Sequence, residues 1–190
     1  MTFEDCIAAG GVAVFPADTV YGLACDPESA AAVERLYALK GRAPGKPAAV
    51  MFFDRERALA ALPELGARTR ALCERLLPGA VTLLVASDRF PLACGPDPGT
   101  LGVRVPDVRA LSAVSRPVLQ SSANLAGGRD PRRLDEVPAS IRDGADVVLD
   151  GGELPGTPST IVDLRAFEES GELAVVRAGA VPEAVIRSVA

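Results

Sequence analysis

The chain has 190 residues, of which 48% are hydrophobic and 24% charged, and its formal net charge is −5. This composition is typical of a soluble globular protein and excludes disordered and fibrous classes, while the length fits one domain, which we expect to span residues 1–190. The acidic balance argues against a dedicated nucleic-acid-binding protein, because such domains usually carry a basic surface, although it leaves room for a local basic groove.

Cysteine and histidine usage limits the metal chemistry. The sequence has no histidine, and its four cysteines form no Cys-x-x-Cys pair. We therefore expect no zinc site of the usual Cys and His type and no metal held by protein side chains alone; a metal would be a hard ion such as Mg²⁺, bound through oxygen and substrate phosphates. Scattered cysteines and the lack of a recognisable signal peptide lead us to expect a reducing cytoplasm. No apolar run reaches the roughly 18 residues that cross a bilayer, so we expect no membrane partner.

Capping signals and apolar periodicity predict a series of helices. Asp26-Pro27 is a typical helix start, Asp54 is expected to cap the next helix, and Asp107 is expected to cap a short one. The second helix should bury one apolar face, and we include Ala30 in it. The predicted helices cover residues 3–9, 27–39, 54–63 and 67–77, and a C-terminal segment that begins at Pro182.

Short apolar runs between these helices predict strands. They cover residues 12–15, 20–24, 48–53, 81–86, 101–106, 118–120, 147–149, 160–162 and 173–176. Strands that alternate with helices indicate an α/β fold, and long turns that allow hairpins favour a mixed sheet whose strand order the sequence does not give. Residues 87–100 are rich in proline and glycine, so we interpret them as a long surface loop.

The stretch from Lys40 to Lys46 gathers three cations in one turn. It reads Lys-Gly-Arg-Ala-Pro-Gly-Lys, and it contains both lysines of the chain on either side of Arg42. Such groups suit a nucleoside triphosphate, although a solvated basic turn would show the same pattern. A P-loop is excluded, because only three residues separate the two glycines and Pro47 follows the last lysine where that loop needs Ser or Thr.

Small polar and cationic groups follow several predicted strands, at the edge where open α/β sheets usually bind ligands. These groups are Asp18-Thr19, Thr100 near Arg104, Ser121 to Asn124, Ser159-Thr160 and Arg177. Each alone could be an ordinary turn or an edge residue, but together they favour a site. The lack of histidine and of a Gly-x-Ser-x-Gly elbow argues against a serine hydrolase, whereas the groups suit phosphoryl or nucleotidyl transfer by positioning and charge neutralisation.

Seven motifs in order along nearly the whole chain resemble those of the YrdC-like threonylcarbamoyl-AMP synthases. The motifs are Pro16-Ala-Asp-Thr-Val-Tyr-Gly-Leu23, Lys40-Gly-Arg42 with Lys46-Pro47, Pro78-Gly-Ala-Val-Thr82, Val103-Arg-Val-Pro106, Ser121-Ser-Ala-Asn124, Ser159-Thr-Ile-Val-Asp163 and Arg177-Ala-Gly-Ala180. The resemblance implies a twisted α/β sheet with a concave, locally basic substrate face. It also implies a nucleotidyltransferase that makes threonylcarbamoyl-AMP and pyrophosphate from L-threonine, bicarbonate or CO₂, and ATP.

The resemblance also assigns roles and partners. Lys40 and Arg42 are expected to be catalytic. ATP is expected to contact Arg42, Lys46, Thr100, Asn124 and Arg177. Threonine is expected to contact Thr19, Arg104, Ser122 and Ser159. Mg²⁺ would come with ATP, and the product would pass to proteins that transfer threonylcarbamoyl to tRNA, where it forms N6-threonylcarbamoyladenosine at position 37.

The chain departs from the family at three positions. Ala17 replaces a usual Thr, Leu77 replaces a usual Trp, and Arg132 stands where the family often has Thr after Pro. We expect the short form of the family, without an additional C-terminal domain. Two alternatives stay open. The first is a double-stranded RNA-binding module of the same fold, with weak binding of RNA on the concave face. The second is a carbamoyl-transfer accessory domain like that of hydrogenase-maturation proteins.

Overall fold

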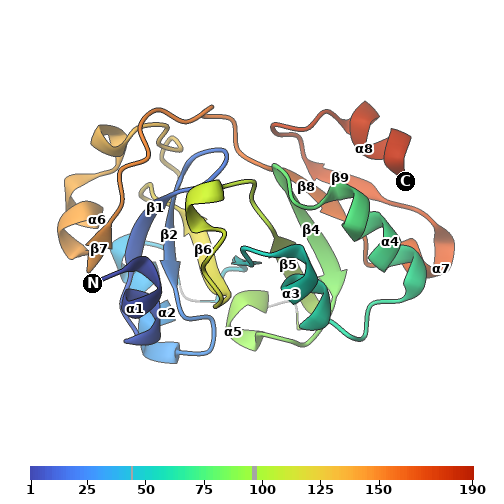
Figure 1. The fold of residues 1–190 in the computed structure, drawn as a ribbon, viewed down its shortest axis with the longest axis horizontal. Helices are drawn as coiled ribbons and strands as arrows, with labels where there is room; N and C mark the ends of the chain where they lie inside the picture. Colours follow the sequence, from blue (N-terminus) through green and yellow to red (C-terminus); the bar gives the residue numbers. More distant parts are fainter. Residues whose placement is uncertain (44, 96–97) are drawn as a thin grey trace.

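The computed structural model describes residues 1–43, 45–95 and 98–190. Position 44 of the Lys40 to Lys46 stretch and positions 96–97 of the predicted surface loop therefore lie outside the described residues. Figure 1 shows the strands in the middle of the molecule, helices packed outside them, and the two chain ends far apart. No helix in the described ranges is long and apolar enough to cross a membrane.

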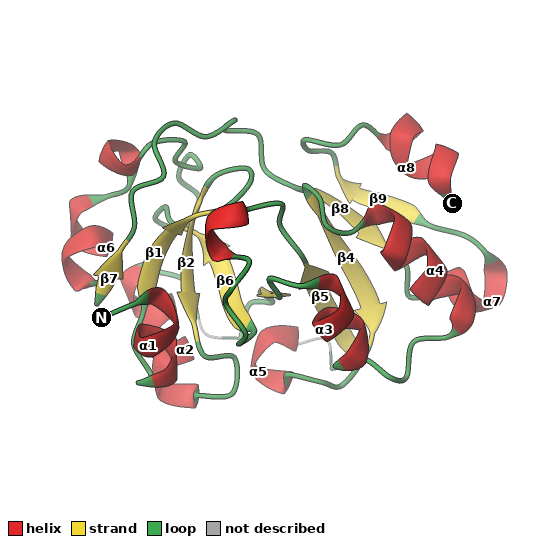
Figure 2. Cartoon of the chain, in the orientation of Figure 1, coloured by secondary structure: helices red, strands yellow, loops and turns green. Residues whose placement is uncertain are grey.

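The strands form one mixed sheet, which confirms the predicted fold class (Figure 2). Their bounds are β1 Ala13–Pro16, β2 Tyr21–Cys25, β3 Ala49–Met51, β4 Val81–Ala86, β5 Thr100–Arg104, β6 Val118–Ser122, β7 Val147–Val148, β8 Thr160–Asp163 and β9 Ala174–Arg177. Their order in the sheet is β7-β1-β2-β6-β3-β5-β4-β8-β9. The pairs β1 with β7, β3 with β5 and β4 with β8 are parallel, and the other neighbours are antiparallel.

Helices and short helical turns connect these strands. Their bounds are α1 Phe3–Ala8, α2 Ala30–Leu39, α3 Arg55–Ala60, α4 Ala67–Leu76, α5 Pro91–Cys94, η1 Arg109–Leu111, η2 Leu134–Glu136, α6 Ala139–Gly144, α7 Phe167–Ser170 and α8 Glu183–Val189. The cap predicted at Asp54 for α3 is confirmed, and α1 has a cap as well. Thr2 and Asp5 form a capping box, and the side chain of Asp54 accepts a hydrogen bond from the backbone of Arg57.

Alternation along the strands gives the central sheet two different faces, because successive side chains in a strand point to opposite sides. Val50 lies opposite Val103 and Leu119 in the neighbouring strands, and all three are buried in the larger hydrophobic core. Ala49 lies opposite Gly102 and Gln120, one register position away and so on the other face. Small side chains at positions 49 and 102 leave space above this face.

A second, smaller hydrophobic cluster covers part of this same sheet at the end near α1. Phe3 of α1 packs against Phe15 of β1, with ring centroids 5.4 Å apart, and against Phe53, at 5.8 Å. Met51 and Val118 join the cluster from β3 and β6. The apolar side chains therefore close one end of the face, and the polar residues at the other end of these strands are left around an open space.

The start of the second helix was predicted three residues too early. Asp26 accepts a hydrogen bond from the backbone of Glu28 and forms a local turn, whereas Ser29 caps α2 by accepting from the backbone of Ala32. This cap moves the helix start and the buried face with it. Ala32 is buried, and Ala30, which we had placed on the apolar face, is exposed.

Two further local predictions were wrong. The segment predicted as a surface loop at 87–100 contains α5, and within it Phe90, Ala93 and Cys94 are buried. Its apolar side chains pack into the larger core, which overrides the proline and glycine signal. Asp107 caps no helix, because η1 begins after Val108 without a side-chain cap and the backbone nitrogen of Asp107 instead donates to Asp18.

Candidate functional site

A pocket of about 440 Å³ lies on the polar face of the sheet. Such a volume suits a small ligand. Its lining residues come from the segment before β3, from strands β3, β4, β5, β6, β8 and β9, from α5, and from loops beside these elements and before β2. They are Val20, Arg42, Pro47, Ala48, Ala49, Thr82, Leu84, Cys94, Thr100, Gly102, Arg104, Gln120, Ser121, Ser122, Asp130, Pro158, Ser159, Ile161, Arg165, Val176 and Arg177.

Four arginines and one aspartate are the charged groups among these lining residues. Arg104 ends β5, Arg177 ends β9, Arg165 follows β8 and Arg42 follows α2. Asp130 is the acidic member. An excess of cations over anions in a concave site favours an anionic ligand, because the low-dielectric walls strengthen the attraction.

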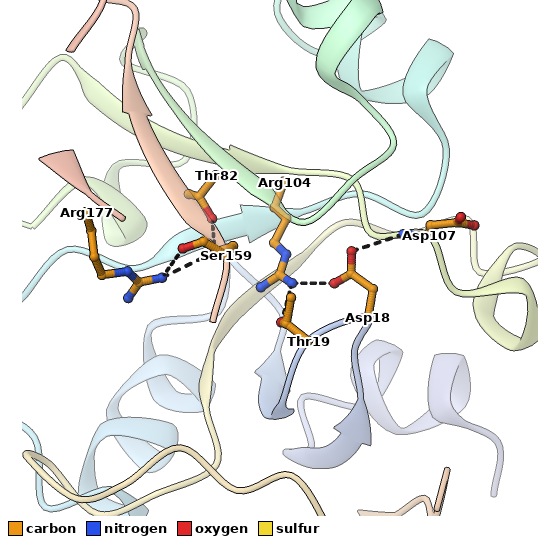
Figure 3. A network of polar contacts seen from close by, with 7 residues as sticks. All are labelled: Asp18, Thr19, Thr82, Arg104, Asp107, Ser159 and Arg177. Carbon is orange, nitrogen blue, oxygen red and sulfur yellow. Dashed lines mark hydrogen bonds and ion pairs between the residues drawn. The ribbon is translucent and has the colours of Figure 1, made fainter. Parts of the chain in front are cut away.

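Arg104 is held from behind by the turn between β1 and β2 (Figure 3). Its Nη2 forms an ion pair with Asp18 and also donates to Oγ1 of Thr19 at 2.7 Å. The side chains of Arg104 and Asp18 are only 4% and 9% exposed. Within the described residues, Nε of Arg104 has no hydrogen-bond partner. One part of the guanidinium is therefore fixed by the protein, and a buried donor remains for a ligand.

Ser159 connects two walls of the pocket. Its Oγ lies 2.8 Å from Oγ1 of Thr82, and its carbonyl oxygen accepts from Nη2 of Arg177 at 2.7 Å (Figure 3). Partial desolvation lowers the pKa of Arg177 from its ordinary value. The guanidinium nevertheless stays protonated, as arginine does in proteins. Gly179 permits this contact, because a Cβ there would lie 2.4 Å from the carbonyl oxygen of Pro158. The Arg-Ala-Gly-Ala motif thus brings its arginine against the start of β8.

Lys40 is buried beside the pocket and points at the end of β6. Its Nζ donates to the carbonyl oxygen of Ser122, and to the carbonyl oxygen and Oδ1 of Asn124 at 2.8 and 2.9 Å. Burial, with the charge of Arg42 as the next cause, lowers the pKa of Lys40 to about 8. Arg42 itself donates from Nη1 to Oγ of Ser121 at 3.0 Å. The two cations therefore fix the same strand end from two sides.

Six of the ten predicted site residues line the pocket. They are Arg42, Thr100, Arg104, Ser122, Ser159 and Arg177. Three others contact lining residues from behind, since Thr19 accepts from Arg104, and Lys40 and Asn124 each hydrogen-bond Ser122. Lys46 is exposed and is not among the lining residues. Its carbonyl oxygen accepts a hydrogen bond from the hydroxyl of Tyr37 at 2.8 Å.

The structure adds residues that the sequence did not assign. Thr82 lay in the Pro-Gly-Ala-Val-Thr motif without a role, and Ser121 lay beside the chosen Ser122. Arg165 follows a strand by two residues, so the strand-end pattern could have found it, and its Nη1 donates to Oγ1 of Thr100 at 3.1 Å. The sequence around Asp130 shows no pattern that would have identified it as a site residue. Among the described residues, no group of three or more His, Cys, Asp or Glu side chains could hold a metal.

Comparison with known proteins gives a family match that spans all the residues lining the pocket. The model of the Sua5/YciO/YrdC family, described as "Telomere recombination", matches residues 5–179. A threonylcarbamoyl-AMP synthase of Chromohalobacter salexigens is 37% identical over 175 residues, which are 86% of this chain and 93% of the relative. One from Thiobacillus denitrificans is 37% identical over 166 residues, which are 82% of this chain and 85% of the relative.

Solved structures agree in fold. The structure of P. abyssi Sua5 complexed with L-threonine matches with a TM-score of 0.86 at 26% identity. The match covers 98% of this chain and 55% of that one, so the chain spans about half of the Sua5 protein. E. coli YciO matches with a TM-score of 0.76 at 25% identity, over 94% of this chain and 88% of that chain.

The lowered pKa of Lys40 gives a prediction that needs no ligand. With only two lysines in the chain, the Lys46→Arg variant leaves Lys40 as the single lysine signal in an NMR titration. We expect its ε-methylene resonance to titrate near pH 8 in the folded protein, against an ordinary value of 10.5. Titration above pH 10 would contradict the burial of a charged Lys40.

The same shift sets the sign of a stability change. Between about pH 8 and 10.5 the unfolded chain holds the lysine proton that the folded protein has released, so this group makes the free energy of unfolding rise with pH in that window. Urea unfolding at pH 7.5 and 10 measures this contribution. The free energy of unfolding of the parent protein should rise between the two pH values relative to that of the Lys40→Arg variant, in which residue 40 does not titrate in this range.

Proposed function

Because the chain belongs to the Sua5/YciO/YrdC family, we propose that it is a threonylcarbamoyl-AMP synthase. The enzyme makes threonylcarbamoyl-AMP and pyrophosphate from L-threonine, bicarbonate or CO₂, and ATP. The observation that carries the proposal is the convergence of the motif residues. Arg42, Arg104, Ser122, Ser159 and Arg177 come from separate motifs along the chain, and all line one pocket.

The pocket arginines lie in two kinds of environment, which suit two different ligand groups. Arg42 and Arg177 are held by neutral hydroxyl and carbonyl oxygens, so their positive charge is available to the phosphates of ATP. Arg104 is already paired with a buried carboxylate and keeps an unpartnered donor, which suits the singly charged carboxylate of threonine. We assign Ser159 and Ser122 to threonine, Thr100 and Asn124 to the nucleotide, and Lys46 to the triphosphate, whose distal end an exposed lysine can reach.

The chemistry needs positioning more than an acid or a base. The neutral amine of threonine adds to CO₂ and forms a C–N bond, and the nitrogen releases a proton to solvent, which gives a carbamate. A carbamate oxygen then attacks the α-phosphorus of ATP, so that the new P–O bond forms and the bond to pyrophosphate breaks. Negative charge moves onto the pyrophosphate oxygens in this step. Fixed cations such as Arg42 and Arg177 stabilise that charge without reorganising. Lys40, which carries its own charge below about pH 8, keeps Ser122 and Asn124 in place beside them.

Mg²⁺ is proposed as the partner of ATP and not as a resident metal. Mg²⁺ in such sites binds substrate phosphates with one or two carboxylates and water. Asp130 is the one carboxylate among the described lining residues, so the donor set fits an ion carried by the triphosphate and fits a closed protein site poorly. When bound, the ion would neutralise phosphate charge, and Asp130 would be its protein ligand.

The cellular setting follows from the reaction. Threonylcarbamoyl-AMP is an activated donor, so we propose that it passes to cytoplasmic proteins that transfer threonylcarbamoyl to tRNA. The four cysteines are free and buried, which agrees with a reducing compartment. The double-stranded RNA-binding alternative gains no specific support, because the arginines line a pocket of small-ligand size, whereas duplex RNA is contacted across an extended surface.

Omission of single substrates tests the reaction. We expect the purified protein to release pyrophosphate from ATP only when both threonine and bicarbonate are present, and to form a product with the mass of threonylcarbamoyl-AMP. Serine in place of threonine is the matched substrate control. Pyrophosphate release that ignores the omission of threonine and of bicarbonate, or no release at all, would contradict a synthase.

Variants in the stretch from Lys40 to Lys46 test its contact with the triphosphate. Arg42→Ala and Lys46→Ala should each lower kcat/KM for ATP by about 100-fold, because each removes a charge that meets the phosphates. Thermal unfolding of Lys46→Ala should stay close to that of the parent protein, because an exposed loop charge contributes little to stability. Arg42→Ala also removes the hydrogen bond to Ser121, so it should unfold at a moderately lower temperature while it stays folded under assay conditions. Arg133→Ala, which breaks an exposed ion pair with Asp135, is the control and should keep full activity. Parental kinetics in both loop variants would mean that this stretch is a solvated turn.

A further inference from the structure

Asp18 is a buried acid beside the pocket to which the reaction assigns no task. It lies in the turn between β1 and β2, and its Oδ1 accepts a hydrogen bond from Nη2 of Arg104. Arg104 lines the pocket, whereas Asp18 does not. Figure 3 shows the carboxylate on one side of the guanidinium and Ser159 on the other. Asp18 therefore contacts the arginine from the side away from the ligand space.

Both oxygens of this carboxylate are engaged. Its Oδ2 accepts from the backbone nitrogen of Asp107 at 3.3 Å, and Asp107 follows β5, the strand that ends at Arg104. Thr19, next to Asp18, accepts from the same Nη2 at 2.7 Å. The turn and the strand end thus hold each other, and the direction of the guanidinium plane is set by protein atoms before any ligand arrives.

The charge of Asp18 also offsets the free-energy cost of burying Arg104. A cation with 4% of its side chain exposed is strongly destabilising without a paired anion. With Nη2 occupied, Nε is a buried donor that has no partner in the described ranges. Recognition of a carboxylate by arginine depends on the orientation of its planar fork, so a fixed guanidinium loses less entropy when the ligand binds.

We propose that Asp18 is a positioning residue for the amino-acid substrate. It holds Arg104 in the orientation that receives the carboxylate of threonine and does not touch the substrate itself. The proposal rests on the proposed function in one respect, which is that the carboxylate of threonine binds to Arg104. It predicts that loss of the negative charge at position 18 weakens threonine binding selectively and leaves ATP binding nearly unchanged.

The Asp18→Asn variant tests this role, because it keeps the size of the side chain and an oxygen acceptor while it removes the charge. We expect the KM for threonine to rise about tenfold or more, whereas kcat and the KM for ATP change by less than about threefold. Calorimetric titration with L-threonine should show the same weakening of Kd without turnover. Should Asp18→Asn fail to fold, Asp18→Ser keeps an oxygen in a smaller side chain and is measured in the same way.

Asp146→Asn is the matched control. Asp146 also pairs with an arginine, Arg35, and also accepts a backbone hydrogen bond, from Val12, but it does not contact the pocket. The control should lose stability and keep the parental KM for both substrates. A purely structural role of Asp18 would give the same pattern as this control.

The outcomes separate the two proposals. A parent protein that binds no threonine overturns both the function and the role of Asp18. A parent that binds threonine, together with an Asp18→Asn variant of unchanged Kd, overturns only the role of Asp18. Equal losses for ATP and threonine would overturn it too, and so would tighter threonine binding, which would mean that Asp18 competes with the substrate for Arg104.

Discussion

The hydrogen bonding of lysine and arginine side chains to oxygen atoms at the strand ends is the interaction on which the pocket depends. In a protein with a net charge of −5, several arginines and a lysine gather on one face of the sheet, and their mutual repulsion must be offset. Lys40, Arg42 and Arg177 donate hydrogen bonds to neutral oxygens, which hold these side chains without cancelling their positive charge. Arg104 alone among these is held by a buried carboxylate, Asp18. The protein thus offers net positive charge where phosphates are expected and a neutralised, oriented guanidinium where a single carboxylate is expected.

The sheet makes this arrangement rigid. One face of the central strands is packed into the larger core through residues such as Val50, Val103 and Leu119, and the other face carries Ala49 and Gly102, whose small size leaves room for a ligand. Groups placed at the ends of well-packed strands keep their geometry better than groups on free loops. Lys46 differs from these groups, because its side chain is exposed and is not among the lining residues; a contact between it and phosphate therefore requires a ligand that extends beyond the pocket lining.

The three departures from the family pattern find places in this structure. Ala17 is buried next to Asp18, so the missing hydroxyl lies in the turn that holds Arg104 and not among the lining residues. Leu77 is buried in the larger core, where an apolar side chain preserves the packing. Arg132 pairs with Glu153, and its carbonyl oxygen accepts from the backbone of Leu154. It therefore ties the segment before β8 to the segment after β6 and stays outside the pocket lining.

The sequence by itself determined most strands, the main helices and the polar groups at the strand ends, because strand alternation, capping and turn chemistry are local properties. It also determined the family through its ordered motifs. The competition between Asp26 and Ser29 for the helix start, and the burial of α5 inside a proline-rich segment, were decided by packing that no short window contains. Only the tertiary structure decided the strand order, which brings β5 between β3 and β4, and with it which residues meet. Asp18 and Arg104 are 86 positions apart, so their pairing follows from that long-range strand order. The hydrogen bond from Lys40 to Asn124 follows from it as well.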